Sequence, residues 1–172
     1  MRFMLFLFAL VVSIEGRAAE TLFGTSDAVT CYQAATISPE LSDDQACNDA
    51  IAAGNLTKSE LAATYSNRGI IRASHGHFDQ AIEDQNASIR LIPQSALAHV
   101  NRANAYHRAK RHQEALADYD QAIALSSGAF APAYYNRSLT YKALGNNEAA
   151  RQDLQQAATL APETYKQALN EP

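Results

Sequence analysis

Two histidines separated by a single glycine, His75-Gly76-His77, are the residues whose type and spacing first suggest chemistry. Imidazole nitrogens are frequent ligands of zinc and copper, and a pair on one short segment could begin a metal site. A third ligand would have to come from His107, His112 or a carboxylate, and no spacing in the sequence selects one. The alternative is a polar turn between two helices in which Gly76 supplies backbone freedom. We predict the turn.

Nucleophilic and phosphate-binding chemistry has no matching motif in this chain. The serines are scattered without a Gly-x-Ser-x-Gly elbow, and the sequence contains neither a phosphate-binding loop nor a Gly-x-Gly-x-x-Gly segment. The carboxylates are expected mainly on solvent-facing helix surfaces or in a repeated column described below. The sequence therefore predicts a protein that is not an enzyme and that uses no cofactor.

The composition favours one helical domain. The chain has 172 residues, 47% of them apolar, with only 7 glycines and 5 prolines. The net charge is −4, and without the first 19 residues 12 basic and 17 acidic side chains remain. This balance predicts no broad basic surface, so nucleic acid is not an expected partner.

The first residues have the order of a secretory signal peptide. Arg2 precedes an unbroken apolar run over 3–12, and residues 13–19 follow, ending in the small residues Ala18 and Ala19. We predict a signal peptide over 1–18, cleavage near Ala18 or Ala19, and a secreted or periplasmic protein without membrane insertion after cleavage. An uncleaved membrane anchor is the alternative.

Cys31 and Cys47 are the two cysteines of the chain. An exported protein meets an oxidising compartment, where cysteines commonly pair. A disulfide between them would close a loop of about 16 residues and contribute roughly 3 kcal/mol in the chain-entropy model. The alternative is that both are small buried apolar side chains.

Several columns of residues recur with a common period. The tripeptide Asn-Arg-small begins at Asn67, Asn101 and Asn136, at spacings of 34 and 35. The same spacings hold for columns of small residues, alanines, arginines and aspartates: Gly69, Ala103 and Ser138; Ala81, Ala115 and Ala150; Arg68, Arg102 and Arg137; Asp84, Asp118 and Asp153. A period of this length is typical of a helical repeat protein.

Each unit has the pattern of two helices separated by a break. Apolar residues at spacings of three and four follow one stripe of each expected helix. The predicted breaks are His75-Gly76-His77, Lys110-Arg111-His112 and Gly145-Asn146-Asn147. Thr57 and Glu60 form a capping box that starts the first unit, and Ser42 to Gln45 form a similar pattern further upstream.

These residues resemble the tetratricopeptide repeat (TPR) family. The family pattern of aromatic, small, aromatic, alanine and proline positions is matched in the third unit by Tyr134, Ser138, Tyr141, Ala150 and Pro162. The second unit offers His99, Ala103, Tyr106, Ala115 and Tyr119, and the first offers Tyr65, Gly69, Ala81 and Pro93, with Arg72 in place of an aromatic. The resemblance implies an all-α fold, an α-solenoid of helix-turn-helix repeats.

The expected organisation is three TPR units with atypical ends. The units span about 62–93, 96–127 and 131–162 within a region 57–172 that closes with a short C-terminal capping helix. Residues 19–56 are expected to hold a mobile segment and a degenerate helical hairpin stapled by the two cysteines. Terminal repeats are often atypical because one of their faces meets water.

The resemblance implies a groove lined by the first helix of each unit. The candidate peptide-binding residues are Asn101, Asn104, His107, Arg108, Tyr135, Asn136, Leu139 and Lys142, with Ser66, Ile70, Ala73, Ser74, Val100 and Ala143 as further groove positions. Their basic and aromatic character suits a protein or peptide partner that is acidic or ends in a carboxylate. The family's carboxylate clamp is not predicted, because Ser66 and Ile70 occupy positions where it needs lysine and asparagine.

The recurring arginines and aspartates are expected to pair as a structural ladder, within or between repeats. Exposed ion pairs of this kind are worth only about 0–1 kcal/mol each. The leading hypothesis is thus an exported, non-enzymatic scaffold that binds a protein or peptide. The alternatives are a structural module that self-associates through its end faces and a histidine-based metal-binding protein. The sequence leaves the oligomeric state open.

Overall fold

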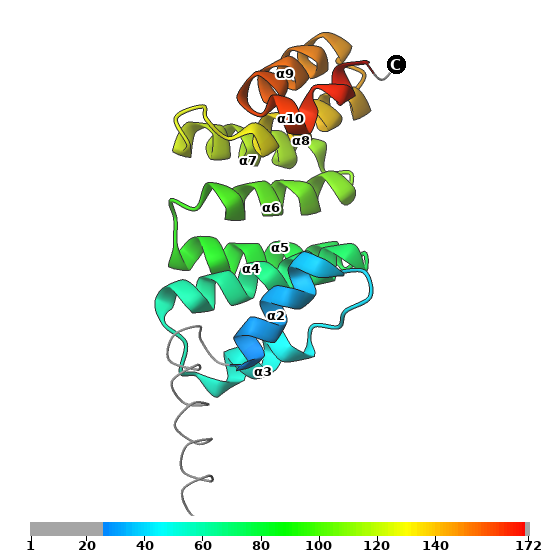
Figure 1. Ribbon diagram of the computed structural model, residues 1–172. Coiled ribbons are helices and arrows are strands. Elements are labelled where there is room, and N and C mark those ends of the chain that lie inside the picture. Colours follow the sequence, from blue (N-terminus) through cyan, green and yellow to red (C-terminus); the bar gives the residue numbers. More distant parts are fainter. Residues whose placement is uncertain (1–25, 171–172) are drawn as a thin grey trace, which may run out of the picture.

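The computed structural model describes residues 26–170, which form helices joined by short turns (Figure 1). The predicted signal peptide and residues 19–25 lie outside this range. The helices are α2 (Ser26–Ile37), α3 (Gln45–Ala53), α4 (Lys58–Ser74), α5 (Phe78–Leu91), α6 (Ala96–Arg108), α7 (His112–Leu125), α8 (Ala131–Ala143), α9 (Asn147–Leu160), α10 (Pro162–Tyr165) and the 3-10 helix η1 (Gln167–Asn170). None of the helices between residues 26 and 170 combines the length and apolar character needed to cross a membrane.

The helices stack as successive hairpins. α4 packs on α5, α6 on α7 and α8 on α9, and each hairpin also contacts the next one along the chain. The first helices α4, α6 and α8 touch in sequence and build one face of the stack (Figure 1). The predicted all-α solenoid is confirmed, and it is stabilised because each hairpin buries apolar surface that it could not cover alone.

The columns of small residues lie where the two helices of a hairpin meet. Ala81, Ala115 and Ala150 are buried in the three hairpins, as are Ala103 and Ser138 in the facing column. Gly69 completes that facing column, and a Cβ atom there would lie only 2.6 Å from Gln85 Nε2. These columns of small residues therefore let the two helices of each hairpin approach closely.

The turns between paired helices differ from the prediction by one residue in two repeats. His75-Gly76-His77 forms the first turn as predicted, but α7 begins at His112 and α9 at Asn147. The position with positive φ is Gly76 in the first turn, Lys110 in the second and Gly145 in the third. A run of polar residues does not indicate at which residue the helix ends. The residue with a left-handed backbone conformation marks that end.

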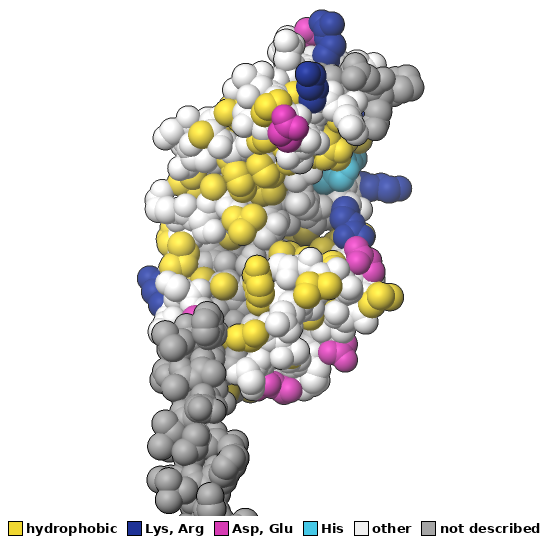
Figure 2. Space-filling model, viewed as in Figure 1, with side chains coloured by type: hydrophobic (Ala, Val, Ile, Leu, Met, Phe, Trp, Pro, Cys, Tyr) yellow, Lys and Arg dark blue, Asp and Glu magenta, His cyan; other side chains and the backbone are white. Residues whose placement is uncertain are grey.

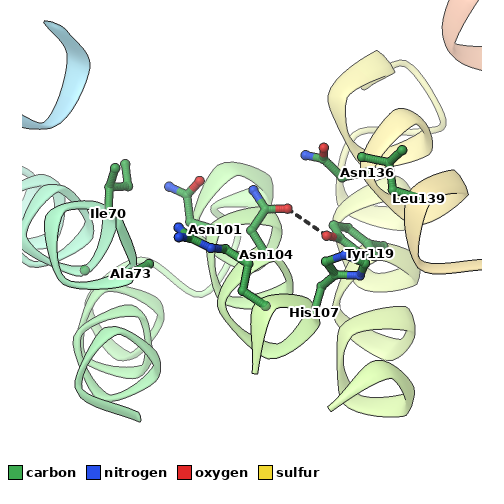
Figure 3. A pocket seen from close by; sticks show the side chains of 10 residues that line it. Ile70, Ala73, Asn101, Asn104, His107, Tyr119, Asn136 and Leu139 are labelled. Atoms are coloured by element: carbon green, nitrogen blue, oxygen red, sulfur yellow. Dashed lines mark hydrogen bonds between the residues drawn. The ribbon is translucent and has the colours of Figure 1, made fainter. Parts of the chain in front are cut away.

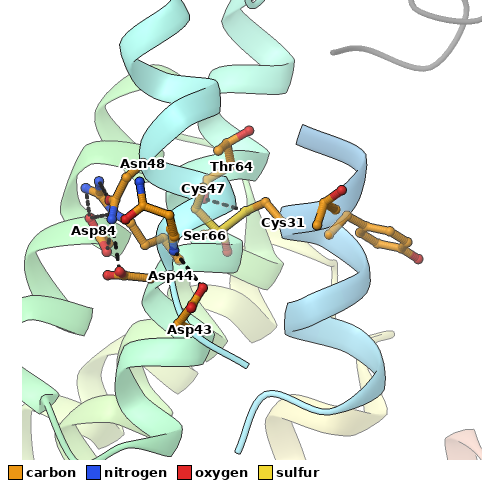
Figure 4. The surroundings of a disulfide bond; sticks show 12 residues. Cys31, Asp43, Asp44, Cys47, Asn48, Thr64, Ser66 and Asp84 are labelled. Atoms are coloured by element: carbon orange, nitrogen blue, oxygen red, sulfur yellow. Dashed lines mark hydrogen bonds and ion pairs between the residues drawn. A yellow bond between two sulfur atoms is a disulfide. The ribbon is translucent and has the colours of Figure 1, made fainter. Parts of the chain in front are cut away.

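The two cysteines lie where the helices of the N-terminal hairpin meet (Figure 4). Cys31 of α2 and Cys47 of α3 have their Cα atoms 4.8 Å apart, which is within the range of a disulfide. Both are fully buried and pack with Ala35 against Ile71 of α4. The pair therefore sits inside a small apolar cluster that connects the hairpin to the first repeat.

The caps of α3 and α4 differ from one another. α4 has the predicted capping box, with Thr57 and Glu60 each accepting the other's backbone N–H. The corresponding prediction for α3 is wrong, because Asp44 is the N-cap and makes no side-chain cap bond. Instead, Asp43 Oδ1 accepts from the Gln45 N–H at 3.1 Å. The tight preceding turn, in which Ser42 donates to the Ser38 carbonyl, removes the predicted hydroxyl from the helix start.

The arginine and aspartate columns form ion pairs within each repeat. Arg68 pairs with Asp84 at 2.6 Å, Arg102 with Asp118 at 2.6 Å and Arg137 with Asp153 at 2.7 Å. The ladder prediction is confirmed, but its assignment to exposed pairs is wrong, because all three aspartates are buried. Removing one partner of a buried pair leaves an uncompensated charge, so each pair matters more than a surface pair does.

Each ladder arginine also reaches back to the preceding hairpin. Its Nη1 group donates to a side-chain oxygen of the previous second helix: Asn48 for Arg68, Asn86 for Arg102 and Asp120 for Arg137. One guanidinium therefore connects two neighbouring hairpins, which its fixed fork of donors makes possible.

Candidate functional site

A pocket of about 360 Å³ lies across the face formed by the first helices (Figure 3). Side chains of α4, α6 and α8 converge on it, together with one tyrosine of α7. Its lining residues are Gly69, Ile70, Ala73, Asn101, Asn104, His107, Arg108, Tyr119, Asn136 and Leu139. We call this pocket the central groove.

Six of the eight candidate peptide-binding residues lie together in the central groove: Asn101, Asn104, His107, Arg108, Asn136 and Leu139. Tyr135 and Lys142 do not line it. Tyr135 instead stacks on Tyr165 of α10 with ring centroids 4.8 Å apart, and Lys142 is exposed on α8. Both residues lie on α8 next to residues that line the groove, but α10 covers Tyr135.

Two of the additional groove positions face the interior. Val100 is 2% exposed and belongs to the apolar core of the second repeat, so its assignment to the groove is wrong. Ser66 is buried and hydrogen-bonds Gln85 of α5 through both its hydroxyl and its carbonyl. Each face of a helix is only a narrow stripe of residues. A small error in the predicted rotation of the helix about its axis therefore assigns a core side chain to the groove.

The asparagines of α6 are held in place by neighbours. Asn101 donates to Ser66 Oγ at 3.1 Å, and Asn104 Oδ1 accepts from the Tyr119 hydroxyl at 2.7 Å (Figure 3). Burial raises the pKa of Tyr119 far above its ordinary value, so its hydroxyl keeps the proton that it donates. The arrangement directs the amide Nδ2 group of Asn104 away from Tyr119, where it can donate to a peptide carbonyl or carboxylate.

His107 connects the second and third repeats. Its Nδ1 atom lies 2.9 Å from the hydroxyl of Thr140 on α8. Burial, followed by the nearby His112, lowers the pKa of His107 below its usual value. The imidazole is therefore neutral at neutral pH, and it shapes the groove as a hydrogen-bonding ring rather than as a cation.

Positive charge in the groove comes from Arg108, at the C-terminal end of α6. Its guanidinium lies 5.3 Å from the ring centroid of Phe78 and donates to the Ser74 carbonyl at 3.5 Å. The side chain remains exposed. Figure 2 shows cationic side chains at one margin of this face, beside a histidine. This margin would attract an acidic group of a ligand.

The histidine pair that suggested a metal site is not part of the groove. The rings of His75 and His77 lie 6.4 Å apart, and His75 Nε2 lies 3.2 Å from the Glu40 carbonyl. Among the side chains described between residues 26 and 170, no three His, Cys, Asp or Glu residues gather as a metal site would require.

Tyr119 is a groove residue that sequence reasoning missed. It lies on a second helix, whereas the groove was assigned to first helices alone. The repeat register could have indicated it, because one position directly follows the aspartate of each repeat. That position holds Gln85, Tyr119 and Leu154 in the three repeats. Only the tyrosine is long enough to pass between the helices and carry a hydroxyl to Asn104.

The stacked hairpins and their shared face define a helical repeat solenoid of the class that presents a ligand groove. A family model described as tetratricopeptide repeat matches residues 94–169. Tetratricopeptide repeat protein 36 of Danio rerio is 30% identical over 131 residues, which cover 74% of this chain and 67% of that protein. The chain belongs to the tetratricopeptide repeat family.

Two further relatives are informative. RNA polymerase II-associated protein 3 of Xenopus laevis is 31% identical over 129 residues, 75% of this chain but only 19% of that larger protein. A solved structure, the second TPR of Spaghetti (RPAP3) bound to the HSP90 peptide SRMEEVD, is 31% identical with a TM-score of 0.54. It covers 58% of this chain and 91% of that chain.

The fold is also similar to that of MamA, at 24% identity and a TM-score of 0.59. That comparison covers 69% of this chain and 67% of that chain. At this level of identity the likeness concerns the arrangement of the helices alone.

Proposed function

We propose that this protein is an exported, non-enzymatic scaffold that binds an acidic peptide segment of a partner protein in the central groove. The observation that carries the proposal is the convergence of Asn101, Asn104, Asn136 and Arg108 from neighbouring helices on one pocket. Amide groups suit a peptide backbone, and a guanidinium suits a carboxylate.

The relatives support a peptide ligand. The two TPR domains of Spaghetti (RPAP3) are each bound to the HSP90 peptide SRMEEVD, which carries two glutamates and one aspartate. Those domains are 31% and 27% identical to this chain. The ligand proposed here shares the acidic character of that peptide, while its own sequence is to be found by experiment.

Export is part of the proposal and rests on two features. Residues 1–18 have the order of a signal peptide, and Cys31 and Cys47 lie close enough to pair. A disulfide persists in an oxidising compartment and is rare in the cytosol. The partner is accordingly expected outside the cytosol.

Selection from a random heptapeptide library tests the function directly. The wild-type protein should enrich peptides containing aspartate or glutamate, because Arg108 gives this end of the groove a positive charge and the exposed Lys142 lies outside the groove on the neighbouring α8. The double variant Arg108→Ala, Lys142→Ala should bind the selected peptides about tenfold more weakly. Arg151→Ala, which removes an exposed arginine of α9 far from the groove, is the matched control.

Two results would contradict the proposal. One is selection that enriches no acidic peptides. The other is equal binding of the selected peptides by the wild type and the double variant, with circular dichroism showing that both are folded.

A further inference from the structure

Tyr32 of α2 is an exposed aromatic residue beside a fully buried one. Its side chain is 58% exposed, whereas its neighbour Cys31 is buried in the disulfide-containing cluster. An exposed ring on a helix whose other side is anchored is held in place with little loss of side-chain freedom on binding. Tyr32 lines two adjoining pockets of about 390 and 370 Å³.

The larger of these pockets lies between α2 and α4, and the other extends from α2 across α4 to α6. The second pocket shares Ile70 and Asn101 with the central groove. Tyr32 therefore stands at one end of a depression that continues into the central groove, where Arg108 is one of the lining residues. A peptide lying in the groove would reach the N-terminal hairpin.

The two ends of this depression differ in chemistry. The pocket that reaches α6 is lined by apolar and uncharged polar side chains, including Tyr32, Ile70, Ile92 and Leu97, without a charged residue. The pocket between α2 and α4 contains one charged residue, Glu60, which is anionic at neutral pH because hydrogen bonds from Thr57 lower its pKa. An acidic side chain would be disfavoured here and attracted to Arg108 instead.

The spacing between the two ends follows from the helices that line them. On α6 the apolar pocket touches residues up to Asn101, and the central groove begins at Asn101 and continues to Arg108. On α6, the centres of these two sets of lining residues are about six residues apart, which is ~9 Å along a helix. An extended peptide covers that distance in about three residues.

The hairpin that carries Tyr32 is fixed to the first repeat on both of its helices. Cys31 Sγ lies 3.8 Å from the Thr64 carbonyl of α4, and the disulfide joins α2 to α3 (Figure 4). On α4, Arg72 pairs at 2.7 Å with Asp44, the N-cap of α3. These contacts keep the wall formed by Tyr32 in a constant position relative to Ile70.

We infer that the N-terminal hairpin adds an apolar subsite to the groove, in which Tyr32 packs against an apolar side chain of the bound peptide. That side chain precedes or follows the acidic residue by about three positions. The inference rests on the proposed function and specifies its ligand: a peptide with one apolar and one acidic anchor. It also assigns a role in binding to the hairpin outside the three repeats.

Two synthetic peptides separate the subsite from the acidic end. The first, Gly-Phe-Ala-Ser-Glu-Glu-Gly, has a phenylalanine three residues before a glutamate, and the second has serine in place of that phenylalanine. Fluorescence anisotropy should show that the wild-type protein binds the phenylalanine peptide about tenfold more tightly. Tyr32→Ala should abolish this preference without lowering the affinity of the protein for the serine peptide.

Leu41→Ala is the matched control. Leu41 is 89% exposed and follows α2, but it lines none of the three pockets described. This variant should retain the tenfold preference. Circular dichroism of all three proteins should be the same, since neither side chain is part of the core.

The outcomes distinguish this inference from the proposed function. Equal binding of the two peptides by the wild type, with affinity lost in Arg108→Ala, would overturn the subsite and leave the function standing. Binding of neither peptide would contradict both. A dimer in sedimentation that Tyr32→Ala dissociates, or a gain of affinity in Phe23→Ser, would overturn the inference by identifying a second copy or the preceding segment as the occupant.

Discussion

The two ends of the solenoid are closed in different ways. At the N-terminal end, the paired positions Cys31 and Cys47 hold α2 against α3 within the hairpin. Arg72 of α4 connects the hairpin to the first repeat through Asp44, and it also pairs with Asp84 of α5. At the C-terminal end, the single turn of α10 lies over the last repeat through the stacking of Tyr165 on Tyr135. One end uses covalent and ionic contacts, and the other uses an aromatic pair.

The difference explains a departure from the repeat pattern. Tyr106 and Tyr141 occupy the aromatic position of the second and third repeats, where the first repeat has Arg72. Arg72 is only partly exposed, and both of its acidic partners lie within 3.0 Å. An arginine is stable at this position because the N-terminal hairpin supplies Asp44 as a partner. The other repeats have tyrosines here and require no acidic partner.

The largest expected effect comes from removing Asp84, which accepts from two arginines. Asp84→Ala should lower the free energy of unfolding by about 3–5 kcal/mol, because it leaves Arg68 and Arg72 without their buried partner. Asp153→Ala at the other end should cost less, since Arg137 retains Asp120. Urea denaturation followed by circular dichroism measures both, and equal losses would contradict the comparison.

Removal of the disulfide should have the next largest effect and should be local. The double variant Cys31→Ser, Cys47→Ser should destabilise the N-terminal hairpin by about 3 kcal/mol. Hydrogen exchange should accelerate at the amides of α2 and α3 and remain unchanged in α8 and α9. Reduction of the wild type should reproduce the pattern; a wild type whose exchange is insensitive to reduction would show that the two cysteines do not pair.

The aromatic closure of the C-terminal end should be weaker. Tyr165→Ala removes the ring that stacks on Tyr135 and should lower the free energy of unfolding by about 1 kcal/mol. Tyr165→Phe preserves the stack and serves as the control in the same thermal denaturation experiment. A loss of the same size in both variants would assign the stability to the hydroxyl instead.

The smallest effect is expected at the turn between the two ends. Lys110 has a φ of 62°, where the equivalent positions of the outer repeats are Gly76 and Gly145. Lys110→Gly should raise the free energy of unfolding by about 0.5–1 kcal/mol, because glycine adopts this conformation without strain. Lys110→Ala removes the same charge but keeps the strain, so an equal gain in that variant would refute the explanation.

Much of the fold could be predicted because its determinants are repeated. Three copies of each column reveal the period, and a small residue or an Arg–Asp pair that recurs in every copy has the same neighbours each time. The positions that differ between copies were harder to predict. Lys110 takes a glycine position, and the side chain of Asp44 does not cap α3, although the sequence pattern places a capping box there.

The candidate site shows the same division. Six groove residues could be named because first helices of successive repeats share one face, and their register follows from the period. Val100 and Tyr135 were misplaced, since the rotation of one helix and the path of the C-terminal turn decide whether a side chain is open or covered. Neither the rotation of that helix nor the path of the C-terminal turn can be read from the repeat period of the sequence.

The sequence by itself determined the repeat length, the columns of small residues and the matching of the arginine column Arg68, Arg102 and Arg137 with a column of aspartates, whereas the structure placed each pair within one hairpin. Only the tertiary structure decided that Arg72 joins Asp44 to Asp84, that Tyr119 supports Asn104, and that Tyr32 stands at the end of the groove. The physical reason is that the first group depends on contacts repeated in every unit. The second depends on side chains that occur once and meet only after unlike hairpins have stacked.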